Sequence, residues 1–486
     1  MIVATVSASR LRDLLGLTAS DSPGYRALSD AVRLLVAEGG LAPRTRLPSE
    51  RELTAALAVS RTTVTRAYAD LRDAGYLVSR RGSGSVVSLP GSRGTTRVAP
   101  VPEALGLHTD DSPDGSVLAW TIASSRAVPG VGRACARAVE ALPAYLGQSG
   151  YHLAGVPALR EAIARRYDER GLPTDPDQVV VTAGAQAGWT LLMRSLARPG
   201  DRVLLDSPTY PNAAEGVRQG GLRPLGVPLD GAGWDVEALA STVRASRPTL
   251  AYLLPDFHNP TGALMDDGTR ERLGRVLARS ATTAVVDETM LDLSLDVEEA
   301  DLPLPFAAHD PSAVTVGSAS KSFWGGLRIG WVRAPHDVAR LLLQRRSATD
   351  LGASLLDQLV VAELLADRDV VLAEQRSTLR AGRARLESLL ADHLPDWRPN
   401  HPSGGMALWT RLPERRSTSV VAAAERQGLL LTSGPRFFVG PGGEQHLRLP
   451  FSRTPEHLDE SVRRLATAWS TLDTPTPHPR AVSMTA

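Results

Sequence analysis

The stretch Ser-Ala-Ser-Lys-Ser-Phe-Trp-Gly-Gly-Leu-Arg-Ile-Gly-Trp, residues 318–331, decides how the rest of the chain is interpreted. It contains Lys321, the only lysine among the 54 Lys and Arg residues of this 486-residue sequence. Arginine supplies charge and hydrogen bonds, but only lysine can lose its proton and act as an amine nucleophile. We therefore expect Lys321 to be present for chemistry, although a single lysine left by chance is the alternative.

Working outward from this stretch, short apolar runs alternate with segments of helical periodicity. This alternation predicts an α/β fold with a mainly parallel sheet that helices cover on both faces. Long helices are expected over 334–393, followed by a smaller α+β region up to about 471. The predicted strands are Val179–Val181, Val203–Leu205, Leu250–Leu254, Ala284–Val286 and Val314–Val316, and the predicted helices span 156–167, 188–197 and 269–279.

Polar clusters come directly after several of these predicted strands. Residues 182–186 follow the first strand, Asn259 follows the third, Asp287 the fourth, and residues 318–321 the fifth. Ligands of open α/β sheets bind in the crevice at the carboxyl ends of the strands. The sequence therefore predicts that these clusters converge on one site.

The chemistry of these residues fits pyridoxal 5′-phosphate (PLP). Lys321 would form the Schiff base, and Asp287 could hydrogen-bond and protonate the pyridine nitrogen, which makes the ring an electron sink. Asn259 is suited to donate to the phenolic oxygen, and Tyr210 could stack on the ring. A strand-ending aspartate is often only a turn former or helix cap, which is the alternative for Asp287.

Two further sets of groups are predicted at the same site. Backbone N–H groups of a turn that opens a helix can bind the phosphate, and nearby hydroxyls and a guanidinium can add to them. Arg448 would then be available to bind a ligand carboxylate. The alternative is that Arg448 only forms an ion pair at the protein surface. The predicted phosphate group consists of Gly184, Ala185, Gln186, Ser318, Ser320 and Arg328.

The order Gly-x-Gln, Pro-x-Tyr, Asn-Pro-x-Gly, Asp, Ser-x-Ser-Lys, Arg, Arg resembles class I/II aminotransferases of PLP fold type I over roughly residues 118–470. The resemblance implies the PLP-dependent transferase fold with a smaller C-terminal α+β subdomain. Such enzymes usually carry a tyrosine two or three residues after the pyridine-binding aspartate, whereas this chain has Thr289 and Met290. Thr289 could replace the phenol in part, and we expect reduced catalysis with retained cofactor binding.

The N-terminal region has a different pattern. Tyr25, Leu28, Val32 and Leu35 fall at helical spacing, Ser49 and Glu52 form a capping-box pattern, and Ser60 is a natural N-cap for a third helix. A predicted hairpin then surrounds residues 80–84. This order predicts a mainly α winged helix-turn-helix, and ten arginines against six acidic residues over 24–88 suggest that it faces a polyanion.

The second helix of a helix-turn-helix lies in the major groove, with its N-terminal residues against base edges. Residues 47–84 resemble the GntR-type winged-helix domain, which implies that Arg51, Arg61, Thr63 and Gly82 contact double-stranded operator DNA. The alternative is that individual exposed arginines are only solvated. The full predicted DNA-binding set is Arg51, Ser60, Arg61, Thr62, Thr63, Arg66, Arg81 and Gly82.

A GntR-like head joined to an aminotransferase-like body resembles the MocR subfamily of bacterial regulators over nearly the whole chain. The resemblance implies a homodimeric, PLP-dependent transcription regulator that responds to PLP or to an amino compound such as γ-aminobutyrate or taurine. One alternative is a working aminotransferase with an accessory DNA-binding domain, and slow transamination could persist in either case. Another is a DNA-binding scaffold whose body binds no cofactor.

The predicted organisation is an extension over 1–22, a winged helix over 23–88, a linker over 89–115, an aminotransferase-like domain over 116–472 and a disordered tail over 473–486. The single cysteine, Cys135, excludes an intramolecular disulfide and a cysteine-rich metal site, and no metal is expected. There is no apolar run of about 18 residues and no signal-peptide pattern, so we expect a cytoplasmic protein without a membrane partner.

Overall fold

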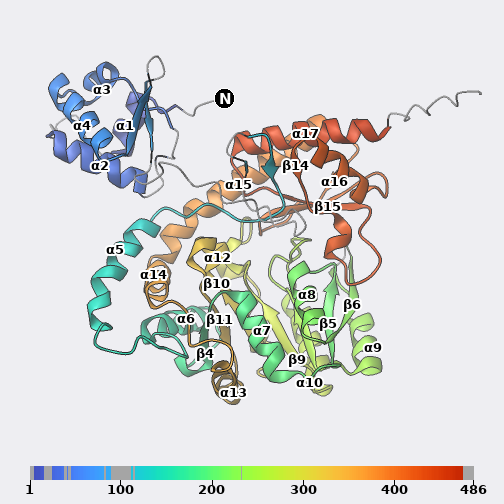
Figure 1. The fold of residues 1–486 in the computed structure, drawn as a ribbon. Helices are drawn as coiled ribbons and strands as arrows, with labels where there is room; N and C mark the ends of the chain where they lie inside the picture. The colour runs from blue at the N-terminus through green and yellow to red at the C-terminus, as the bar shows by residue number, and fades with distance from the viewer. Residues whose placement is uncertain are drawn as a thin grey trace, which may run out of the picture. The chain divides into compact units, whose positions relative to one another are not determined.

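The computed structural model describes residues 5–15, 24–37, 41, 45–80, 84–88, 111–112, 115–230 and 233–473. The chain divides into two compact units, and its elements carry the labels of Figure 1. The first unit, called the head below, comprises residues 1–107 and 129–136. The second unit, called the body, comprises residues 108–128 and 137–486.

The head contains the predicted winged helix-turn-helix. Helix α3 begins with the predicted capping box, in which Ser49 and Glu52 satisfy each other's backbone N–H groups, and Ser60 caps α4 by accepting from the Thr63 backbone N–H. Helices α2, α3 and α4 bury their apolar faces in one core, and β1 and β2 pair as an antiparallel hairpin. The bounds are α2 Tyr25–Ala37, α3 Glu50–Leu57, α4 Arg61–Asp73, β1 Leu77–Arg80 and β2 Gly84–Val87.

One element of the head was not expected. Within the predicted extension 1–22, residues Ala8–Leu14 form helix α1, which Ser7 caps and which buries Leu11 completely in the head core. Thr5 forms an isolated bridge with Arg46. The predicted wing residues Arg81 and Gly82, most of the predicted linker and nearly all of the predicted tail lie outside the described residues.

The body is built on an eight-stranded sheet in the order β4-β11-β10-β9-β8-β5-β6-β7. All five predicted strands are present, and the sheet is mainly parallel as predicted, because only β11 and β7 run against their neighbours. The bounds are β4 Val179–Thr182, β5 Arg202–Ser207, β6 Arg223–Asp230, β7 Gly233–Trp234, β8 Leu250–Leu253, β9 Thr283–Asp287, β10 Val314–Ser318 and β11 Gly330–Arg333.

Helices cover both faces of this sheet, because its central strands are apolar on both sides. One face packs against α7, α8 and α13, and the other against α6 and α10, with α9 beside α10 (Figure 1). The bounds are α6 Pro157–Glu169, α7 Ala185–Leu196, α8 Pro211–Gln219, α9 Val236–Ser246, α10 Asp267–Arg279, α11 Phe306–His309, α12 Ala319–Ser322, α13 His336–Arg346 and α14 Leu355–Ala366. Helix α5, Val131–Ala141, begins in the head unit and ends in the body unit.

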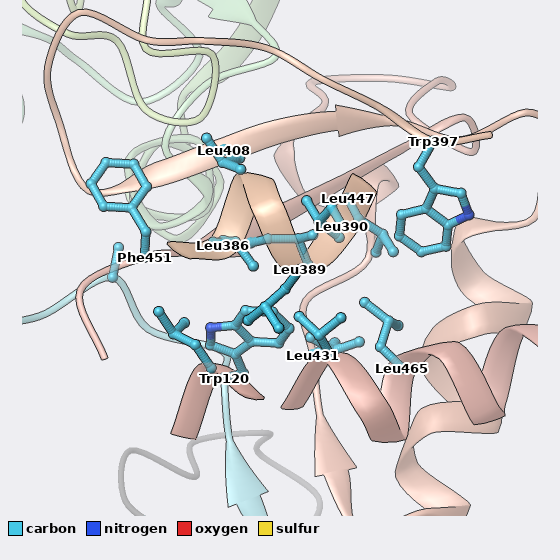
Figure 2. Packing of buried hydrophobic residues seen from close by; sticks show 14 of the residues in the cluster. Trp120, Leu386, Leu389, Leu390, Trp397, Leu408, Leu431, Leu447, Phe451 and Leu465 are labelled. Atoms are coloured by element: carbon cyan, nitrogen blue, oxygen red, sulfur yellow. The ribbon is translucent and has the colours of Figure 1, made fainter. Parts of the chain in front are cut away.

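The predicted smaller α+β region completes the body. Strands β12, β13 and β15 form an antiparallel sheet, and β3 pairs in parallel with β14. Figure 2 shows the core of this region, where Trp120 packs beside leucines of α15 and α17. The bounds are β3 Leu118–Ala119, α15 Arg368–His393, β12 Arg398–Pro399, β13 Ala407–Arg411, α16 Ser417–Arg426, β14 Leu429–Leu430, β15 His446–Pro450 and α17 Pro455–Asp473.

A search of the described ranges for a membrane-spanning helix found none that is both long enough and apolar enough.

Candidate functional site

The polar clusters follow strands β4, β5, β8, β9 and β10 of the sheet. These strands share one direction, since β11 runs antiparallel to both β10 and β4. Their carboxyl ends therefore meet at one edge, where ligands of open α/β sheets bind. The structure brings Lys321, Asp287, Arg328 and Arg448 close enough for the other three charges to shift the pKa of Lys321.

Lys321 lies in the short helix α12, directly after β10. Its Nζ donates a hydrogen bond to the Ala123 carbonyl oxygen at 2.7 Å. Burial, together with the positive charges of Arg448 and Arg328, lowers the pKa of Lys321 to about 8, although the negative charge of Asp287 opposes this shift. About a tenth of the amine is therefore neutral at pH 7, and the neutral form is the one that attacks an aldehyde.

Asp287 is the last residue of β9 and is buried. Its Oδ1 accepts from the Thr289 backbone N–H at 2.9 Å, and its Oδ2 accepts from the Tyr252 hydroxyl. Burial raises the pKa of Asp287, whereas the bonds from Tyr252 and Thr289 and the charge of Lys321 lower it. Asp287 therefore has hydrogen-bond donors on both oxygens, so the strand-ending aspartate is held by specific partners.

Tyr252 was missed in the sequence because a tyrosine inside the apolar run 250–254 is indistinguishable from a core residue. Thr289 was expected to replace the absent tyrosine in part. In the structure its backbone and its side chain both hydrogen-bond to Asp287. Met290 lines a small cavity with Ala123 and Asn259. A thioether thus lies near Asn259 where the resembling enzymes usually place a phenol.

Arg448, on β15, is buried rather than a surface residue, and it makes no ion pair within the described chain. Its Nη1 donates to Asn259 Oδ1 at 3.2 Å, its Nη2 donates to the Thr121 carbonyl oxygen, and its guanidinium lies 4.9 Å from the centre of the Phe437 ring. Burial lowers the pKa of Arg448 to about 10. Its buried Nε has no hydrogen-bond partner among the described residues, which suits an anionic ligand.

Gly184 precedes α7 with a positive φ of 89°, and no side chain caps the helix. The positive φ is what requires glycine here, and the absence of a Cβ also leaves room for Nη2 of Arg328, which would lie 2.8 Å from such an atom. The Ala187 and Gly188 N–H groups donate to the Gly184 carbonyl oxygen, so the N–H groups of Ala185 and Gln186, which precede them at the start of α7, are the ones that can bind an anion. This turn and Arg328 together form a cradle for an anion.

The remaining predicted phosphate residues differ from one another. Ser318 caps α12 by accepting from the Ser320 backbone N–H at 3.1 Å, whereas the buried Ser320 hydroxyl has no partner within the described chain. The Gln186 side chain donates to the Asn212 carbonyl oxygen at 3.3 Å, so Gln186 can contribute through its backbone N–H. Ser320 is the hydroxyl that the structure leaves for a ligand.

Tyr210 lies at the start of α8, after β5. Its hydroxyl accepts from Asn212 Nδ2 at 2.9 Å. Burial raises the pKa of Tyr210, and the charges of Asp287, Arg448 and Arg328 also act on the hydroxyl. Tyr210 therefore lies within the same group of charges as Lys321.

The predicted DNA-binding residues lie on the head. Arg51, Arg61 and Thr62 are exposed, while the Ser60 hydroxyl lies 2.8 Å from that of Thr63 within the α4 cap. The exposed Arg66 guanidinium lies 5.7 Å from the centre of the Tyr25 ring. Arg51, Arg61 and Thr62 thus present polar groups to solvent, whereas Ser60 and Thr63 mainly hold the start of the helix.

Residues 144–465 match the family described as aminotransferase class I and II. The chain belongs to this family. Residues 24–87 match the bacterial regulatory proteins of the gntR family. The combination is that of the MocR subfamily, as the resemblance of the sequence had predicted.

Two regulators are similar to this MocR-type chain over most of its length. The probable rhizopine catabolism regulatory protein MocR of Rhizobium meliloti is 28% identical over 477 residues, which cover 93% of this chain and 95% of the relative. The HTH-type pyridoxine biosynthesis transcriptional regulator PdxR of Corynebacterium glutamicum is 28% identical over 451 residues, which cover 90% and 93%.

Among solved structures, the body resembles LysN, an alpha-aminoadipate aminotransferase of Thermus thermophilus complexed with N-(5′-phosphopyridoxyl)-L-leucine. The TM-score is 0.66 at 29% identity, and the match covers 74% of this chain and 93% of LysN. The fold is therefore PLP fold type I, and PLP is the cofactor that it implies. The residues fit PLP, because they combine an amine of lowered pKa, a buried carboxylate and an anion cradle with an unpartnered hydroxyl.

Proposed function

We propose that this MocR-type regulator binds operator DNA through its head and senses PLP, or an amino compound that reacts with bound PLP, through Lys321. The observation that carries this proposal is the environment of Lys321: the amine is desolvated and lies among Asp287, Arg328 and Arg448. A lysine kept only for charge would have no need of this environment. The relative PdxR is named for pyridoxine biosynthesis, which supports PLP itself as one candidate signal.

The body residues have separate tasks in this proposal. PLP supplies an aldehyde for Lys321 and an electron-withdrawing ring. Asp287 would hold a proton at the ring nitrogen, Asn259 would donate its amide N–H to the phenolic oxygen, and Tyr210 would pack on the ring. The cradle of Gly184, Ala185, Gln186, Ser320 and Arg328 would hold the phosphate, with Ser318 fixing the start of α12.

Arg448 would bind a carboxylate on the amino compound. Its Nε is a buried donor without a partner within the described chain, and Asn259 holds Nη1. A bidentate guanidinium–carboxylate pair would use Nε and Nη2, with the carboxylate replacing the Thr121 carbonyl oxygen on Nη2. The proposal therefore favours effectors that carry both an amine and an acidic group.

On the head, Arg61 and Thr62 at the start of α4 would reach base edges, with Arg51 and Arg66 on phosphates. Arg81 and Gly82 of the wing remain predicted backbone or minor-groove contacts. Arginine can pair with guanine through two hydrogen bonds, so Arg61 is our candidate for sequence readout.

The proposed regulator is a homodimer. Several large apolar side chains of the body are exposed, and more than half of them lie in two segments, residues 146–153 and 351–356. These segments are neighbours, because the backbone of Gly352 lies against that of His152. Sedimentation of the full chain should give a dimer, and L146E/Y151E should shift it towards monomer, whereas a monomeric wild type would contradict this arrangement. The exposed side chains of these two segments are Leu146, Tyr151, Leu153, Leu351 and Leu356.

The test of the proposed function is spectroscopic. The purified protein with PLP should show the visible absorption of the covalently attached cofactor. Because alanine has no amine to attach the aldehyde, this absorption should be lost in Lys321→Ala. If Lys321→Ala kept the band and still responded to PLP, the role of Lys321 would be wrong.

A working aminotransferase is the second candidate, because Lys321, Asp287 and Arg448 are all retained and grouped. Met290 and the engagement of Thr289 with Asp287 favour slow chemistry, since neither supplies the phenol of the resembling enzymes. Release of 2-oxo acids from a panel of amino acids, with a different 2-oxo acid supplied to accept the amino group, separates the two functions. Multiple turnovers would favour the enzyme, and slow or absent release the regulator.

A further inference from the structure

Both cations of the ligand site donate to the backbone of one segment. Lys321 Nζ donates to the Ala123 carbonyl oxygen at 2.7 Å, and Arg448 Nη2 donates to the Thr121 carbonyl oxygen. These are the two groups that the proposed function reserves for an aldehyde and a carboxylate. The carbonyls of Thr121 and Ala123 therefore compete with a ligand for the same donors.

This segment, residues 118–128, is called the strap below, and it is fixed at both ends. At its start, β3 pairs with β14, and Trp120 is buried in the core of the small α+β region, where its Nε1 donates to the Pro450 carbonyl oxygen at 2.7 Å (Figure 2). At its end, the Val128 N–H donates at 3.1 Å to the carbonyl oxygen of Phe323, the residue that follows α12. The strap thus connects the small region to the end of the helix that carries Lys321.

The middle of the strap depends on side chains outside the cofactor site. The Ser452 hydroxyl donates to the Ser124 carbonyl oxygen at 2.9 Å, and the Thr432 hydroxyl donates to that of Thr121 at 3.3 Å. These two bonds hold the strap in the position from which its carbonyls reach Lys321 and Arg448.

We propose that the strap is an internal competitor of the effector, docked on Lys321 and Arg448 until a ligand takes these groups. In the sequence, the strap continues directly from the predicted linker 89–115, which leads to the DNA-binding head. Release of the strap would reach the linker through the anchored residues 118–120, which lie between the two in the sequence. This inference rests on the proposed function and adds how the occupied site is signalled.

Competition has a measurable consequence. When a protein must leave one conformation before it binds a ligand, its apparent affinity is the intrinsic affinity multiplied by the fraction of molecules in the binding-competent conformation. Weakening the docked strap must then tighten ligand binding, although the altered side chains touch neither Lys321 nor Arg448. A strap that only stabilises the site predicts the opposite sign.

The experiment titrates full-length T432V/S452A with PLP and follows the visible absorption. Removal of two hydrogen bonds that hold the docked strap should tighten apparent PLP binding about fivefold. The matched control is T242V/S246A, which removes two hydroxyl-to-carbonyl bonds within α9, at 2.9 and 2.5 Å, away from the strap. The control should bind PLP as the wild type does.

Unchanged or weaker PLP binding by T432V/S452A would overturn the strap proposal and leave the proposed function standing. Hydrogen exchange of the wild type provides a test that needs no variant: PLP should speed exchange at amides between 121 and 125, and equal or slower exchange would also overturn it. If the wild type showed no covalent binding of PLP at all, the proposed function itself would fail.

Discussion

The head and the body use their cations in opposite ways. On the head, Arg51, Arg61 and Arg66 are exposed to solvent. In the body, burial lowers the pKa of Lys321 to about 8 and that of Arg448 to about 10. The same chain thus displays one set of charges at a surface and desolvates another.

The difference teaches what each unit can do. Exposed arginines keep their charge and gain affinity for a polyanion through released counterions, so their effect depends on salt. A desolvated lysine gains a neutral fraction and becomes a nucleophile. The head is therefore suited to electrostatic and base-edge contacts, and the body to covalent chemistry with an aldehyde.

The largest effect should come from moving the lysine. In K321R/R340K the lysine and an exposed arginine of α13 exchange places, so composition and net charge stay the same. Because arginine cannot supply a neutral amine, the visible absorption of attached PLP should disappear completely. Retention of the band would show that attachment depends on the presence of a lysine rather than on its buried position.

A smaller but still large effect is expected for R448Q. Loss of the guanidinium should weaken a carboxylate-bearing ligand by about 1.5–3 kcal/mol. Arg448 also lowers the pKa of Lys321, so its removal should raise that pKa, and the rate of PLP attachment should then reach its plateau at higher pH. Stopped-flow absorption across pH measures this, and a profile that is unmoved or shifted to lower pH would contradict the coupling.

On the head, R61A should weaken operator binding by about 1–3 kcal/mol and relax the choice of base at one position. The operator can be selected from random DNA with the wild-type protein, and affinities measured by fluorescence anisotropy. R66A, whose guanidinium lies over the Tyr25 ring, serves as the comparison and should weaken all sequences alike. If R61A lost the same affinity for operator DNA as for random DNA, Arg61 would not contact a base.

The smallest effect is expected for Y252F. Without the Tyr252 hydroxyl, one oxygen of buried Asp287 loses its donor, which should raise the pKa of Asp287 and weaken PLP binding by about 1 kcal/mol. Y145F removes a hydroxyl of the body whose ring contacts His152 instead, and should bind PLP normally. Identical affinities for the two variants would leave Tyr252 as a packing residue.

Sequence patterns were sufficient for the winged helix, the main strands and the edge of the sheet at which the polar clusters meet. They were sufficient because parallel strands of one sheet have their carboxyl ends at the same edge, and this does not depend on how individual side chains pack. The roles assigned to individual residues at that edge remain predictions. Of these residues, only their positions and hydrogen bonds are fixed by the fold.

What sequence could not predict depends on contacts between distant segments. Helix α1 is seven residues long and completely buries only Leu11, which is too little for a periodic signal. Tyr252 resembles any strand residue until β8 is placed beside β9. The strap acts through backbone carbonyls of Thr121 and Ala123, which carry no residue-type signature.

The central claim is that occupancy of the Lys321 site changes how the head binds DNA. Operator affinity of the full chain, measured with and without PLP for wild type and K321R/R340K, tests it most directly. We expect PLP to change the affinity of the wild type and to leave that of K321R/R340K unchanged. An equal response to PLP in both proteins, or none in a wild type that carries the attached cofactor, would contradict the account.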